Sequence, residues 1–159
     1  MKFLFVSLLF ASSVFGYCQD SLIVKKDIAP LLGYQQFQKS FVEAGIAKVK
    51  WSTNGLISTM SYGLAGEIGV TDKVYGVKTF FRYGGSVNVG FNLIYYGEYE
   101  VGKYNTLRFR PEIGLGSGFV NLIYGYNLPI THSDFKGINT HMVTLQFIFS
   151  PKMLKQGLL

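Results

Sequence analysis

Apolar and polar residues alternate along most of the chain, which is the period of a β-strand with two different faces. Residues 86–101 show this most clearly, with large apolar side chains on the odd positions and mainly Asn, Gly and Glu on the even ones. Similar runs occupy 58–70, 74–84, 107–114 and 140–149, a weaker one occupies 40–51, and 28–37 has an ambiguous phase. The pattern predicts about eight strands between Ile28 and Ser150.

Short segments with Gly or Asp separate these runs at 71–73, 84–86, 102–105 and 116–118. Such segments form tight hairpins, and strands joined by hairpins are antiparallel. A slightly longer connection occupies 52–55, and 129–137 is the longest loop. We therefore expect an all-β fold, an antiparallel up-and-down barrel.

Nearly all the charge within the predicted strands falls on the face opposite the apolar one. This face carries every Glu and every Arg of the chain, and its four bases almost balance its five acids: Glu43, Glu67, Lys78, Arg82, Glu98, Glu100, Arg108, Arg110 and Glu112. The net charge of +6 must then come from lysines near turns and termini. Balanced charges among glycines are typical of the interior of a narrow barrel, where buried charges must be paired. We expect these nine residues to form a charge network in the lumen.

Alternation alone does not tell the inside of a barrel from its outside, and a soluble barrel or sandwich is the alternative. The polar face has one lysine and many glycines, unlike a soluble exterior, and the apolar face has too many bulky aromatics for an eight-stranded lumen. A closed barrel is the sheet that can span a bilayer. Its interfacial aromatics would be Trp51, Tyr75, Tyr83, Tyr95, Tyr99, Tyr124 and Tyr126.

Two features of the apolar face are unusual for a barrel that spans a bilayer. Lys48 and Lys50 lie on that face but close to a strand end, where a lysine can extend its ammonium group to the interface. Pro111 removes one hydrogen bond from its ladder, and a bulge or a position near the interface would accommodate it.

The N-terminus has the features of an export signal. Lys2 precedes a short apolar stretch, and cleavage is plausible after Gly16 or after Cys18. Lipidation of Cys18 is an open alternative, although Tyr17 is large for the residue before a lipidated cysteine. We expect a signal peptide at 1–18, a periplasmic segment at 19–27, an outer-membrane barrel at 28–150 and a tail at 151–159. No segment after residue 20 is long and apolar enough for a transmembrane helix.

With its signal peptide and alternating strands, the chain resembles the small eight-stranded outer-membrane β-barrel proteins of Gram-negative bacteria. Residues 141–149, HMVTLQFIF, resemble the closing signal of these proteins, with Phe147 and Phe149 as its aromatic residues. The resemblance implies an outer-membrane location, contact with outer-membrane lipid and insertion by the barrel-assembly machinery. One departure is the tail, which continues ten residues beyond Phe149.

The sequence offers little catalytic chemistry. His132, Ser133 and Asp134 are adjacent in the longest loop, but adjacent residues do not form a triad with one another. His141 and Thr144 do not match the His-x-Ser pattern of the lipid A deacylases in this class. Two histidines and one cysteine make no convincing metal site, and no cluster of basic residues points to nucleic acid.

We therefore expect a non-enzymatic outer-membrane barrel without cofactors and with a plugged lumen, acting structurally or as an accessory subunit of a larger outer-membrane assembly. The alternatives are passage of small solutes or lipids and, less favoured, lipid modification. The outer wall and short loops favour packing against another membrane protein over adhesion.

Overall fold

The computed structural model describes residues 24–52, 58–99, 105–116, 118–135 and 137–155. In this part of the chain the sheet consists of β1 (Val24–Gln36), β2 (Ser40–Ser52), β3 (Ser58–Gly69), β4 (Val74–Gly84), β5 (Val87–Glu98), β6 (Asn105–Gly116), β7 (Val120–Tyr126), β8 (Leu128–Pro129) and β9 (His141–Ile148). A short helix, α2 (Pro151–Leu154), follows the last strand. None of the helices among these residues is long and apolar enough to cross a membrane.

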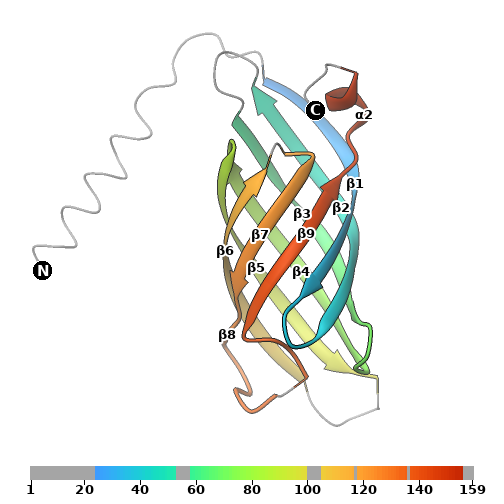
Figure 1. The fold of residues 1–159 in the computed structure, drawn as a ribbon, viewed down its shortest axis with the longest axis vertical. Coiled ribbons are helices and arrows are strands. Elements are labelled where there is room, and N and C mark those ends of the chain that lie inside the picture. Colours follow the sequence, from blue (N-terminus) through green and yellow to red (C-terminus); the bar gives the residue numbers. More distant parts are fainter. Residues whose placement is uncertain (1–23, 53–57, 100–104, 117, 136, 156–159) are drawn as a thin grey trace, which may run out of the picture.

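The sheet closes on itself into a barrel (Figure 1). Every pair of neighbouring strands is antiparallel, and β1 pairs with both β2 and β9. The start of β1 and the end of β9 lie at the same end of the barrel, and the 127–140 connection lies at the opposite end (Figure 1). We call these the terminal end and the loop end. The predicted antiparallel up-and-down barrel is confirmed.

The two short elements β7 and β8 are parts of one strand, so the barrel has eight strands around its wall. Glu112 pairs with Gly125 and Phe109 pairs with Leu128, which is one continuous register with a gap at Arg110 and Pro111. Pro111 has no N–H to donate, so the ladder is interrupted beside it. Asn127 lies at this interruption and faces the lumen, on the same inward face as Asn121 and Ile123.

The first strand begins earlier than the sequence indicated. β1 starts at Val24 rather than Ile28, because it extends alongside β2 as far as the pair Val24 and Ser52. Its phase is also settled, since Leu31 and Gln35 are buried inside while Leu32 faces outward. The predicted signal peptide and residues 19–23 lie outside the described part of the chain.

The interior is layered. Most charged side chains lie between two apolar clusters along the barrel, and further buried polar residues such as Asn88 and Asn121 lie towards the terminal end. Towards the terminal end the cluster contains Ala29, Leu31, Ala47, Val49, Trp51, Ala65, Phe80 and Ile148. Towards the loop end it contains Phe41, Val74, Ile94, Tyr96, Phe135 and Met142, with Ile138 packed against them.

The outer wall is apolar. Large side chains such as Ile46, Leu64 and Leu115 have about 60% of their surface exposed. Phe91 lies between Phe81 and Phe109, with ring centroids 5.5 and 6.1 Å away, and forms an aromatic band about midway along the strands. The face that the alternation marked as apolar is therefore the outside of the barrel.

Six of the seven aromatic residues expected at the interfaces lie on this outer wall: Tyr75, Tyr83, Tyr95, Tyr99, Tyr124 and Tyr126. All but Tyr83 lie towards the loop end. The expectation for Trp51 is wrong, because its side chain is only 1% exposed and packs inside the barrel. Trp51 lies an even number of positions along β2 from Glu43, so strand alternation places both on the same inward face.

Candidate functional site

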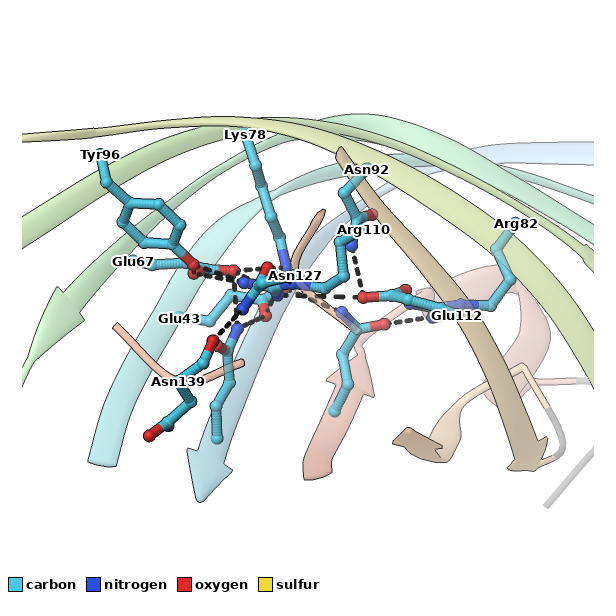
Figure 2. Close-up of polar contacts among 12 residues, drawn as sticks. Glu43, Glu67, Lys78, Arg82, Asn92, Tyr96, Arg110, Glu112, Asn127 and Asn139 are labelled. Atoms are coloured by element: carbon cyan, nitrogen blue, oxygen red, sulfur yellow. Dashed lines mark hydrogen bonds and ion pairs between the residues drawn. The ribbon is translucent and has the colours of Figure 1, made fainter. Parts of the chain in front are cut away.

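Glu67 on β3 is a buried carboxylate of the lumen with partners from several strands (Figure 2). Arg110 on β6 donates to both of its carboxylate oxygens, at 3.0 and 3.1 Å. Gln35 donates to Oε1 at 2.8 Å, Lys78 lies 3.0 Å from the same oxygen, and the hydroxyl of Tyr96 donates to Oε2. A two-pronged arginine–carboxylate contact is among the strongest and most directional hydrogen-bonded pairs in proteins.

A second carboxylate, Glu43 on β2, shares two of these partners. Lys78 donates to its Oε2 at 2.8 Å, and Gln35 donates to the same oxygen at 2.7 Å. Gln146 on β9 donates to Oε1 at 2.8 Å. Lys78 therefore bridges two glutamates and neutralises part of the charge of each.

Glu112 on β6 forms the third centre. Arg82 donates to its Oε2 at 3.0 Å, and Asn92 donates to its Oε1. Arg110 lies 3.9 Å from Oε1, which joins this centre to that of Glu67. Arg82 also donates to the side-chain oxygen of Gln146, which joins it to Glu43.

These contacts form one network that reaches every strand of the barrel wall, and we call it the lumen network: Gln35, Glu43, Glu67, Lys78, Arg82, Asn92, Tyr96, Arg110, Glu112, Asn127 and Gln146. Three acids and three bases make it neutral overall. Every carboxylate oxygen in it has a donor. Because all are already occupied by neighbours, these carboxylates are suited to hold the barrel in register and poorly suited to proton transfer or ion coordination.

Arg108 has a different role from the one expected. It lies in the lumen and is almost fully buried, but its guanidinium donates to the backbone oxygens of His132 and Phe135, at 3.3 and 3.4 Å. It is thus separate from the glutamates, because it lies nearer the loop end than Arg110. Its contacts hold the connection between β8 and β9 over that end of the barrel.

Further bonds fasten the same connection. The N–H of Leu107 donates to Thr131 Oγ1 at 2.9 Å, and the amide of Asn139 both accepts from and donates to the backbone of Lys39, at 2.8 and 2.6 Å. Asn127 accepts from Nε of Arg110 and donates to the backbone oxygen of Asn139, each within 2.8 Å. Phe135 packs into the apolar cluster beneath. We call residues 130–135 and 137–140 the cap.

Six of the nine residues expected in the lumen network belong to it. Arg108 is one exception, and Glu98 is another. Glu98 ends β5 at the rim of the barrel and is only half buried, and within the described residues no ion pair or hydrogen bond joins it to the lumen network. Glu100 lies outside the described residues.

Sequence reasoning missed the neutral members of the network, which are Gln35, Asn92, Tyr96, Asn127 and Gln146. Alternation places Asn92, Tyr96 and Gln146 on the inward face, but the predicted network contains charged residues alone. The ambiguous phase of residues 28–37 leaves the direction of the Gln35 side chain undetermined from the sequence. Asn127 lies just past the end of β7 on the same inward face as Asn121 and Ile123, so alternation continued beyond Tyr126 indicates its direction.

The histidines considered for chemistry and their loop neighbours lie apart from the lumen network, whereas Thr144 is buried in the lumen opposite Gln35. His132, Ser133 and Asp134 are exposed in the cap, and His132 has a positive φ of 43°. Nδ1 of His141 lies 2.7 Å from the hydroxyl of Tyr124 on the outer wall. No group of three or more His, Cys, Asp or Glu side chains able to hold a metal ion occurs among the described residues.

The predicted closing signal at 141–149 covers the whole of β9, and its two aromatic residues lie towards the terminal end. The rings of Phe147 and Phe149 stack on the outer wall with centroids 6.2 Å apart, and the N–H of Phe149 donates to the oxygen of Pro30 at 2.9 Å. Comparison with protein-family models, with curated proteins and with solved structures finds no match to this chain.

Proposed function

We propose that this protein is an integral outer-membrane β-barrel whose closed lumen makes it a structural component or an accessory subunit of an outer-membrane assembly. The observation that carries the proposal is the inverted distribution of polarity, with a neutral charged network inside and a continuous apolar wall outside. Monomeric soluble proteins rarely expose apolar patches larger than a few hundred Å². A closed barrel in lipid needs such a wall, since lipid surrounds it.

The long connection between β8 and β9 supports an orientation. Outer-membrane barrels have short turns on the periplasmic side and longer loops outside the cell. The terminal end, with the short β4–β5 turn, would then face the periplasm, and the cap would face outward. The tyrosines near the loop end would lie at the outer interface, where aromatic rings are favoured.

The layered interior supports a plug rather than a pore. Eight strands leave a lumen that side chains fill, and here two apolar clusters enclose the lumen network. The alternative, passage of small solutes or lipids, requires both the cap and the network to open. Planar-bilayer recordings distinguish the two, because a plugged barrel gives no stable conductance steps and a channel gives uniform ones.

Fractionation of the native membrane tests the location. We expect the chain in the outer-membrane fraction, resistant to alkaline carbonate and extracted only by detergent. The size and composition of the particle in mild detergent then test the subunit role, for which we expect stoichiometric protein partners. Recovery of the chain in the aqueous fraction would contradict the membrane location, and a monomeric particle would contradict the subunit role.

The proposal contains no catalytic step. We therefore expect the same mass spectrum of lipid A from membranes with and without the protein. A mass difference corresponding to loss or gain of an acyl chain would identify a lipid-modifying enzyme instead.

A further inference from the structure

The outer wall has a groove across β2, β3 and β4. Small residues, including Ala44 and Gly66, form its floor between the larger Ile46, Leu64 and Val77, and its volume is about 610 Å³. A Cβ atom added at Gly66 would have no neighbour closer than 3.9 Å, so the space above this glycine is open. The groove is almost entirely apolar, and Lys48 lies among its lining residues.

A second hollow of about 360 Å³ adjoins the groove at the terminal end. Ile28 and Lys48 line both, and Lys26, Asp27 and Lys152 complete the second hollow. The register of β1 with β2 pairs Lys26 with Lys50 and Ile28 with Lys48, which brings lysines of both strands to the same patch of wall. An apolar groove thus adjoins a hollow whose lining includes three lysines and one aspartate.

The tail contributes Lys152 through a defined set of contacts. Ser150 Oγ donates to Asp27 at 2.8 Å, and the ammonium of Lys152 lies 3.5 Å from the same carboxylate. Of the three lysines in this hollow, only Lys152 has an acidic partner among the described residues, so two positive charges remain. Lys48 and Lys50 each lie 5.9 Å from the centre of the Tyr62 ring, which holds their side chains against the wall.

We propose that the groove and the adjoining hollow together bind one anionic phospholipid, with an acyl chain in the groove and the phosphate among Lys26, Lys48 and Lys152. This inference rests on the proposed membrane location, and the lipid belongs to the leaflet at the terminal end. From Lys48 to Ala44 the groove follows four residues of strand, roughly 13 Å, along which an extended acyl chain can lie. The charge of the hollow complements a phosphate.

A second copy of the chain fits this surface less well than a lipid. A symmetric dimer through the groove would bring the same lysines of both copies towards one another, and like charges at an interface repel. A flexible acyl chain also fills an uneven groove without needing a matching protein surface.

The test uses the full chain purified in neutral detergent and titrated with dioleoyl phosphatidylglycerol or dioleoyl phosphatidylcholine, with bound lipid counted by native mass spectrometry. We expect one retained phosphatidylglycerol and weaker binding of phosphatidylcholine. Lys48→Gln should lower the affinity for phosphatidylglycerol about fivefold and leave that for phosphatidylcholine unchanged. Lys39→Gln, at the loop end, is the matched charge control and should change neither.

A second variant tests the groove. Gly66→Leu fills the groove from its open floor and should weaken the binding of both lipids. Val89→Phe adds apolar bulk to the outer wall of β5, outside the groove, and should weaken the binding of neither lipid. Equal affinity for the two lipids, or no effect of Gly66→Leu, would overturn the inference. A dimeric particle that Gly66→Leu converts to a monomer would also overturn it, because the occupant would be a second copy.

These results are separable from the test of location. Chain that partitions into the aqueous phase refutes the proposed function before any lipid is added, and this inference with it. Chain that inserts into membranes but shows no lipid preference refutes only the binding site.

Discussion

Arg110 on β6 holds both carboxylate oxygens of Glu67 on β3, at 3.0 and 3.1 Å, across the inside of the barrel. These strands are not neighbours, since β4 and β5 lie between them. The contact therefore braces the barrel across its lumen, independently of the hydrogen bonds of its wall. Both side chains are fully buried, so the loss of either would leave the other charge without its main partner.

Arg110→Ala should destabilise the barrel by about 3–5 kcal/mol, because it leaves buried carboxylates without their arginine. The double variant Arg110→Met/Glu67→Leu should lose less free energy of unfolding than the single variant, because it removes both members of the pair and retains the contact of Lys78 with Glu43. Urea-induced unfolding in detergent micelles, followed by loss of the folded band in unheated electrophoresis, measures both. Equal costs for the single and double variants would refute the network as a paired unit.

Arg108→Ala should release the cap with a smaller loss of stability than Arg110→Ala. Arg108 donates from one nitrogen to two backbone oxygens at 3.3 and 3.4 Å rather than to a buried carboxylate, and these long, shared contacts together are worth about 1.5–3 kcal/mol, the range for one hydrogen bond to a charged group. Limited proteolysis should cut the variant within residues 130–140 faster than the wild type. Arg108→Lys is the control, because it keeps one charged donor and should retain part of the protection.

Trp51 is the single tryptophan of the chain, so its fluorescence reports which way this position faces. Because it is packed in the lumen, its emission should be blue-shifted and resist quenching by both acrylamide and brominated lipids. In a Trp51→Phe/Tyr83→Trp variant the reporter moves to the outer wall, and brominated lipids should quench it. Strong quenching of the wild type by brominated lipids would place Trp51 at the interface after all.

Charge on the outer wall should be tolerated according to its position along the strand. Leu93→Arg lies in the middle of β5 and should lower the free energy of unfolding in lipid by about 2–4 kcal/mol. Val87→Arg lies at the start of the same strand and should lower it by about 0–1 kcal/mol. Refolding into lipid vesicles at graded urea concentrations measures the difference. Equal effects at the two sites would contradict a wall that spans a bilayer.

The alternation of apolar and polar residues along the chain predicts the strands of the barrel and the direction of their side chains. A strand presents side chains to opposite faces with period two, so the inward direction of Glu43, Arg82 and Arg110 follows from local geometry alone. Trp51 obeys the same rule, and the error made there came from giving its residue type more weight than its position. The broken strand opposite Pro111 is likewise a local consequence of a missing N–H.

Pairings across the lumen depend on closure of the whole barrel. Which base meets Glu67 is decided by the sum of the registers of every hairpin between β3 and β6, and no single segment carries that sum. The same holds for Arg108, which meets the cap rather than a glutamate, and for the lysines that β1, β2 and the tail bring to one hollow. The sequence by itself determined which side chains face inward and which outward, because that is a property of each strand. Only the tertiary structure decided which of them touch, because contact is a property of the closed sheet.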